Sequence, residues 1–370
     1  MKKKKLYLFT LILFCTVSLL STAQVTVPTP LNNDTAKKEI SLPRYFKTYS
    51  HEFSLDTIPE ASKLLINNMH GSITYSGWDM DSIVLEAKVW TEAPFRAAAV
   101  EVYNEITVAS VLNSDEFRFR TQIRDNFSPI YNFGIDYHII GPRELIMEIY
   151  NRFGSATITN YSGRGTFNID HGDLKINSYP NMDIEELIIN LSNGNIISDR
   201  IKKGDISHKN GVIEIDYTDS LLLNCDFSKV SIKNSINVDA TLKTSNIEIG
   251  SNENLNIKGS NSFIKTEEIK NYGFIDVSDG EITIKNLDLQ FQKLTLSTTN
   301  TKIDLTVDQN LNYNIHGIAE FANFYHYDIE NLRIIKEGGR TSFSGVVGNS
   351  DSPSTIILFG SKKDITIKQK

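Results

Sequence analysis

Cysteine is nearly absent from this chain, and basic residues do not outnumber acidic ones. With two cysteines in 370 residues, a disulfide framework is excluded. The formal net charge is -7, which argues against nucleic acid as a partner because phosphate binding requires a cationic surface. The chain is not a disordered polymer either, since 40% of its residues are hydrophobic. This is enough apolar material for a sizeable core and one or two domains.

Motifs of catalysis and metal binding are also missing. There is no Gly-x-Ser-x-Gly elbow, no phosphate-cradling loop, no dinucleotide fingerprint and no glycine-rich calcium nonapeptide. Of the scattered histidines, only His171 and His208, each near a turn glycine, are candidates to approach one another. Acidic spots at 185–186, 267–268 and 279–281 are explained as well by solvated turns as by calcium or paired carboxylates. We therefore expect no catalytic residue, no metal and no cofactor.

Residues 1–23 have the three-part pattern of a secretory signal peptide. Four lysines precede an apolar stretch from Leu6 to Leu20, and Ser21-Thr22-Ala23 places small residues before the cleavage point at Gln24. The apolar stretch is short for a bilayer-spanning helix, which needs about 20 residues. The sequence thus predicts an exported protein of the periplasm or cell surface, with no transmembrane segment after cleavage.

Three regions are expected in the mature chain. Residues 24–52 contain prolines and no apolar period, and we interpret them as a flexible linker with at most a local strand. Residues 53–144 alternate short apolar runs with turn residues, which predicts a β-rich region with one helix near 93–106. Residues 145–370 follow a repeat.

The repeat consists of apolar-x-apolar triplets, most of them 17 or 18 residues apart. Their first positions are 156, 174, 196, 213, 230, 247, 264, 282 and 303. Because side chains alternate along a strand, the outer members of each triplet point into a core and the middle members, mostly polar, point to solvent. The pattern predicts an all-β chain with a parallel β-solenoid, a single-stranded β-helix, capped near residues 310–370. A β-sandwich with coincidental spacing is the alternative.

Two local features of the repeat carry further expectations. Glycines 154, 172, 194, 211 and 280 lie at its turns and are expected to take a positive φ, with Ser228, Ser245 and Asn300 replacing them elsewhere. Cys225 follows a run of three leucines, which favours a buried, inert thiol.

Several of these stretches resemble a known family. Residues 148–158 and 167–176, together with the earlier 68–73 and Gly77-Trp78-Asp79, are similar to the exported adhesin-like family of Bacteroidetes-type bacteria, whose function is unknown. The resemblance extends from about residue 60 to the C-terminus. It implies a β-helical, surface or periplasmic, non-catalytic protein, and relatives often associated with envelope-stress regulation. It transfers no active site.

The sequence therefore predicts a non-catalytic cell-envelope protein, an adhesin-like binding or structural β-helix whose partner is an envelope protein or a surface glycan. Two alternatives stay open: a carbohydrate-active β-helix enzyme, either a polysaccharide lyase or a hydrolase, and a periplasmic envelope-stress sensor that binds a regulatory protein. The candidate binding residues are aromatic, because rings stack on sugars and anchor interfaces. They are Phe321, Phe324, Tyr325 and Tyr327, although the same rings suit a cap over the last coil.

Overall fold

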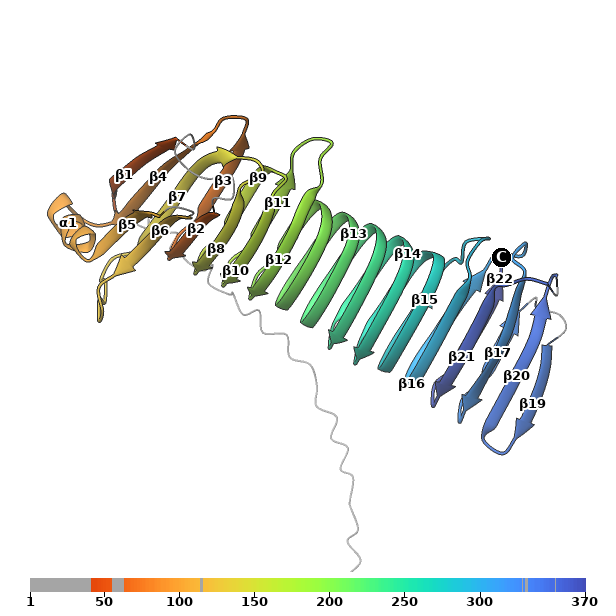
Figure 1. Cartoon of the computed structure of the whole chain (residues 1–370). Coiled ribbons are helices and arrows are strands. Elements are labelled where there is room, and N and C mark those ends of the chain that lie inside the picture. The colour runs from red at the N-terminus through yellow and green to blue at the C-terminus, as the bar shows by residue number, and fades with distance from the viewer. Residues whose placement is uncertain (1–40, 55–62, 114–115, 328, 330–331, 350) are drawn as a thin grey trace, which may run out of the picture. The chain divides into compact units, whose positions relative to one another are not determined.

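Strands account for most of the described chain (Figure 1). The computed structural model describes residues 41–54, 63–113, 116–327, 329, 332–349 and 351–370. The predicted signal peptide and residues 24–40 of the predicted linker lie outside these ranges. The described strands form one 22-stranded sheet with parallel and antiparallel pairs, and the helix α1 (Arg96–Asn104) lies within the range predicted to be helical. The expectation of a nearly all-β chain is confirmed.

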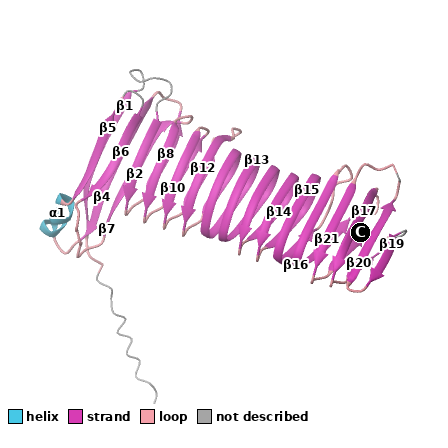
Figure 2. Cartoon of the chain, turned by 60° about the horizontal axis from the view of Figure 1, so that its bottom comes forward, coloured by secondary structure: helices cyan, strands magenta, loops and turns pink. Residues whose placement is uncertain are grey.

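Parallel strands make up the middle of the chain, where the first of them pair with the next strand but one and the later ones with the next strand (Figure 2). They are β8 (Ile146–Arg152), β9 (Ala156–Tyr161), β10 (Arg164–Asp170), β11 (Leu174–Ser178), β12 (Ile184–Ser192), β13 (Ile196–Lys243), β14 (Asn246–Ser260), β15 (Phe263–Ile284) and β16 (Lys293–Val307). Val230 pairs with Ile247, and Ile247 with Ile264, each 17 residues further along the chain. All pairings among the strands from β8 to β16 are parallel, which argues against a β-sandwich.

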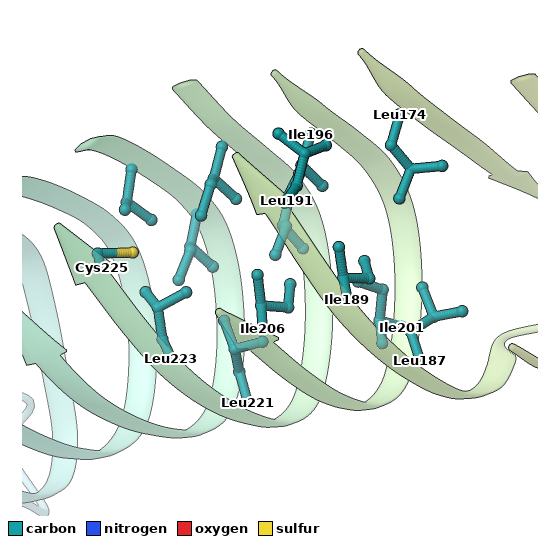
Figure 3. Packing of buried hydrophobic residues seen from close by; sticks show 14 of the residues in the cluster. Leu174, Leu187, Ile189, Leu191, Ile196, Ile201, Ile206, Leu221, Leu223 and Cys225 are labelled. Atoms are coloured by element: carbon teal, nitrogen blue, oxygen red, sulfur yellow. The ribbon is translucent and has the colours of Figure 1, made fainter. Parts of the chain in front are cut away.

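The aliphatic side chains of these strands gather in one continuous cluster (Figure 3). In β15, Ile275 and Val277 are buried while Phe274 and Asp276 between and beside them are exposed, as the alternation along a strand requires. Parallel neighbours lie about 4.8 Å apart, so each turn of chain covers the apolar side chains of the next. Burial of this kind contributes roughly 25 cal/mol for each Å² of apolar surface.

Tight corners form a column along the stack, and there the expected positive φ is wrong for four of the five glycines. Positive φ angles belong to the preceding residues, for example His171 (56°) before Gly172 and Asn193 (58°) before Gly194. The four glycines without a positive φ are Gly154, Gly172, Gly194 and Gly280, whereas Gly211 has φ 155°. Asn300 has the expected positive φ (50°). At the serine corners the positive φ belongs to the preceding residue, Phe227 before Ser228 and Thr244 before Ser245.

The corner glycines are needed because backbones approach closely. A Cβ on Gly194 would lie 2.0 Å from the carbonyl oxygen of Gly172, and one on Gly172 would lie 2.1 Å from that of Gly154. Further along the column serines replace them, and the Oγ of Ser245 accepts a hydrogen bond from the backbone N–H of Ser228 at 3.0 Å. The column thus changes from backbone contact to side-chain hydrogen bonds.

The N-terminal end of the sheet contains antiparallel strands. They are β1 (Arg44–Ser54), β2 (Lys63–Met69), β3 (Ile73–Trp78), β4 (Ser82–Glu92), β5 (Ile106–Leu112), β6 (Glu116–Ile123) and β7 (Phe133–Pro142). Strand β1, the local strand allowed within the predicted linker, pairs with β4, and β5 pairs with β6. Strands β2 and β3 lie inside this end, since β2 pairs with β6 and β8, and β3 with β7 and β9.

The C-terminal end repeats this insertion. Its strands are β17 (Tyr313–Glu320), β18 (Phe324–Tyr327), β19 (Leu332–Glu337), β20 (Arg340–Val347), β21 (Thr355–Ser361) and β22 (Ile365–Gln369). The last strands of the chain are not outermost: β21 lies between β16 and β17, and β22 between β16 and β18. Strands β20 and β19 continue from β17 as antiparallel neighbours. The segment predicted as a cap therefore consists of strands added to the same sheet.

Cys225 is buried as expected, with 1% of its surface exposed. Burial raises the pKa of its thiol to about 12, so the reactive thiolate is scarce at neutral pH. We expect the native protein without residues 1–23 to show almost no reaction with a thiol reagent at about pH 8, and full reaction after unfolding. Absorbance from an aromatic disulfide reagent measures this, and full reaction of the native protein would contradict the burial.

Candidate functional site

A hollow lies on the outer face of strands β13 to β16, and we call it the aromatic hollow. It has a volume of about 620 Å³. Its outward-facing residues come from five neighbouring segments: Ser220, Leu222, Asn237, Asp239, Asn254, Asn256, Tyr272, Phe274, Lys293 and Thr295. Three of them expose large apolar side chains, Leu222 at 51%, Tyr272 at 48% and Phe274 at 39%.

Strand register places these side chains in two columns. Asn237 pairs with Asn254 and Asn254 with Tyr272, which gives one column. Asp239 pairs with Asn256 and Asn256 with Phe274, which gives the second. The aromatic rings therefore form one wall, the amide side chains form the floor, and Leu222 forms the opposite wall.

Alternation explains why both rings point outward. Tyr272 and Phe274 lie on either side of Gly273, whose position faces the core. A Cβ on Gly273 would lie 2.7 Å from Cδ1 of Leu294, so the glycine keeps the core close beneath the rings. The Tyr272 hydroxyl donates a hydrogen bond to Oε1 of Gln292, which fixes the direction of that ring.

Hydrogen bonds between neighbouring segments order the polar floor. Nδ2 of Asn254 donates to Oδ1 of Asn237 at 2.8 Å, and Nδ2 of Asn256 donates to Oδ2 of Asp239 at 3.1 Å. Each contact uses one of the two N–H donors of the amide. Within the described part of the chain, the Oδ1 acceptors of both residues have no partner and remain for a ligand.

A second hollow, of about 410 Å³, lies further toward the C-terminal end of the sheet. It is lined by residues of β17, β19 and β20 and by Phe359 of β21, which is 44% exposed. The two hollows are neighbours, because Thr295 pairs with Ile357 and Ser297 with Phe359. Exposed apolar side chains thus recur between Leu222 and Phe359, with the polar residues of the floor between them.

The predicted binding residues do not form one surface. They are Phe321, Phe324, Tyr325 and Tyr327. Phe321 is a corner residue and is 78% exposed, whereas the ring of Phe324 is half-buried and stacks on Phe343 with 3.8 Å between centroids. Tyr325 and Tyr327 are exposed on β18, which pairs only with β22 among the described strands. Their role in binding stays a prediction.

Sequence reasoning missed the aromatic hollow, although the sequence contains a signal for it. In the preceding repeats the two outward positions read Asn237 and Asp239, then Asn254 and Asn256. In the next repeat they read Tyr272 and Phe274. Two aromatic residues at positions that carry amides or an acid in the two preceding repeats mark a change in what the outer surface contacts.

His171 and His208 are not a metal pair, because their side chains have different partners. Nδ1 of His171 lies 2.8 Å from Oδ1 of Asp170 at the exposed corner. His208 is buried, with Nδ1 at 2.7 Å from the Oγ of Ser228 and Nε2 at 2.9 Å from the carbonyl oxygen of Gly194. No cluster of metal-binding side chains occurs in the described residues.

Burial of His208 predicts a pH dependence of stability. Desolvation lowers its pKa in the folded protein, against a smaller opposing effect of the hydrogen bond to Gly194. Below about pH 6.5 the unfolded chain therefore binds a proton that the folded chain excludes, so acid favours unfolding. We expect His208→Gln to lose less of its free energy of unfolding than the wild type between about pH 7.5 and about pH 5.

Urea unfolding at the two pH values measures this difference, and comparison with the wild type removes the common effect of the carboxylates. The exposed His326 provides the control, since His326→Gln should follow the wild type. An equal loss in His208→Gln and the wild type would exclude His208 as the source.

The acidic spots predicted at 185–186 and 267–268 are held in ion pairs. Glu186 binds Lys203 at 2.5 Å, and Glu267 binds Lys285 at 2.7 Å. Hydrogen bonding to Lys285 lowers the pKa of Glu267, which keeps that carboxyl ionised. These carboxylates stabilise contacts between neighbouring coils and do not converge on either hollow.

Comparisons with known proteins give distant structural neighbours only. No family model and no curated protein matches the chain. A protein named a "putative adhesin" from Parabacteroides distasonis has 9% identity and a TM-score of 0.34, covering 88% of this chain and 97% of that one. A "putative adhesin" from Bacteroides fragilis has 11% identity and a TM-score of 0.26, with the same coverage.

A "putative lipid binding protein" from Parabacteroides distasonis has 15% identity and a TM-score of 0.32, covering 69% of this chain and 93% of that one. The names of the adhesin neighbours agree with the family that the sequence resembles. Because these TM-scores are low, the function proposed below rests on this chain's own residues. Among the described residues, no helix has the length and apolar character to span a bilayer.

Proposed function

We propose that this chain is an exported, non-catalytic binding protein of the cell envelope, built as a parallel β-solenoid, whose partner is a surface glycan or an envelope protein. The observation that carries the proposal is the aromatic hollow, in which Tyr272 and Phe274 are exposed above a polar floor. Aromatic side chains in partly exposed hollows are typical of binding sites. The regular parallel register from β8 to β16 supports the solenoid and a rigid support for that surface.

Export to the periplasm or the cell surface is supported by the signal-peptide pattern of residues 1–23. It is consistent with a lone, buried cysteine, because Cys225 has no exposed thiol to form chance cross-links in an oxidising compartment. The names of the adhesin neighbours agree with such a location.

A binding role is favoured over glycan cleavage by the chemistry of the hollow. Glycoside hydrolysis requires two carboxyl groups that flank the scissile bond, one of them with a raised pKa. Among the residues that line the aromatic hollow, all of which the structure describes, Asp239 is the single carboxylate. It accepts a hydrogen bond from Asn256.

A screen of the purified mature protein on surface glycans and envelope extracts tests this function. We expect retention of a glycan or an envelope protein, without new reducing or unsaturated ends after long incubation. Release of such ends would support the lyase or hydrolase alternative and overturn the non-catalytic proposal. Absence of any bound partner would overturn the binding role.

A further inference from the structure

We propose that the aromatic hollow binds a linear, uncharged polysaccharide that runs across the strands, from Leu222 past Tyr272 and Phe274 toward Phe359. This deepens the function proposed above and rests on it. The hollow, its hydrogen-bonding groups and the spacing of its strands each point to this ligand.

The wall of the hollow offers the apolar contact that sugar rings require. One face of a pyranose ring carries C–H groups, and such a face packs on an aromatic ring. Tyr272 and Phe274 present two rings from one strand. The hydrogen bond from the Tyr272 hydroxyl to Gln292 fixes the Tyr272 ring before the ligand binds. A ring that is already fixed loses little conformational freedom on binding.

The floor offers acceptors for sugar hydroxyl groups. Asn254 and Asn256 line the hollow, and one N–H of each amide is already bound, to Asn237 or Asp239, while the Oδ1 acceptors have no partner within the described residues. These acceptors are neutral, and a hydroxyl is the donor that suits them without the desolvation of a charge. The lining carries one acid, Asp239, and one base, Lys293, so it has no net charge to select an ionic ligand.

The spacing of the strands suits a repeating polymer. Neighbouring strands are about 4.8 Å apart, which is about the advance of one sugar unit in an extended chain. Four strand spacings separate Asp239 from Ile357, which is two residues before Phe359. The segment of Leu222 lies one spacing further, since Asn237 donates a hydrogen bond to the carbonyl oxygen of Asp219, so the row from Leu222 to Ile357 extends over about 24 Å. A chain of about five sugar units fills this length, and the second hollow lies at its end.

The test measures binding of soluble, uncharged linear glycans of β-linked glucose, xylose or mannose. Affinity gel electrophoresis identifies the polymer, and calorimetry with its oligosaccharides gives the Kd. We expect affinity to rise with the length of the oligosaccharide up to about five sugar units and then to level, because longer chains find no further contacts between Leu222 and Phe359. We expect Phe274→Ala and Tyr272→Ala each to raise the Kd about three- to tenfold.

A matched control is available on the same strand. Phe263 lies in β15 like Phe274, is 54% exposed and is not part of either hollow. Phe263→Ala should leave the Kd unchanged, and thermal unfolding of all variants should show that the folded state persists. Tyr272→Phe separates the ring from its hydroxyl and should retain most of the affinity.

The outcomes separate this inference from the function it rests on. If the wild type retains an envelope protein and no glycan, the binding role stands and the polysaccharide assignment fails. If a glycan binds equally well to Phe274→Ala and Phe263→Ala, the site assignment fails. Binding only to charged polymers, weakened by salt, would also overturn the uncharged ligand. If nothing binds, both proposals fail.

Discussion

A chain that ends at Asn349, and so lacks β21 and β22, is expected not to fold to a stable monomer. Removing these strands takes away four fully buried side chains, Ile356, Leu358, Ile365 and Ile367. At about 1.5–3 kcal/mol each, the loss of about 6–12 kcal/mol is comparable with the whole free energy of unfolding of a typical domain. It also leaves β16 and β17 each with an unpaired edge and takes from β18 the strand it pairs with, and open strand edges favour aggregation.

Size-exclusion chromatography with light scattering and thermal unfolding measure this result. A soluble monomer with an unchanged melting temperature would contradict it. A pair of point variants tests the same interior without opening an edge: Leu358→Asp places a carboxylate in the core, whereas Phe359→Asp places it at an exposed position one residue away. We expect Leu358→Asp to unfold the end of the sheet, and Phe359→Asp to lower the free energy of unfolding by less than about 1 kcal/mol.

Substitution of a corner glycine is expected to have the second-largest effect. In Gly194→Ala the new Cβ would lie 2.0 Å from the carbonyl oxygen of Gly172, and this atom belongs to backbone that cannot rotate away. Adjacent coils must separate, and overpacking of this kind costs about 1–3 kcal/mol or more. We expect a fall in the free energy of unfolding of at least about 3 kcal/mol, measured by urea unfolding.

Ser245→Ala is the matched substitution in the same column. It removes an oxygen that accepts from the N–H of Ser228 and donates to the carbonyl oxygen of Lys243 at 2.8 Å. We expect a loss of about 1–2 kcal/mol, since two hydrogen bonds are lost without a steric clash. A smaller effect for Gly194→Ala than for Ser245→Ala would show that the backbones can separate easily.

The position of the candidate site was hidden from sequence reasoning for a physical reason. The predicted aromatic residues are close in sequence, at 321–327, but a corner and the alternation of β18 direct Phe321, Phe324 and Tyr325 differently. Tyr272 and Phe274 line the same hollow as Leu222 only because 17- and 18-residue steps bring the two segments between them into register. A surface made by many coils is visible only once the register is known.

The amino-acid sequence alone determined the all-β class, the repeat length and which side chains point inward, because all three follow from the alternation of apolar and polar residues. It could not determine which strands lie at the ends. The tertiary structure decided that β2 and β3 enter between β6–β7 and β8–β9, and that β21 and β22 return between β16 and β17–β18. Such choices depend on contacts between residues far apart in the chain, where local pattern carries no information on the partner.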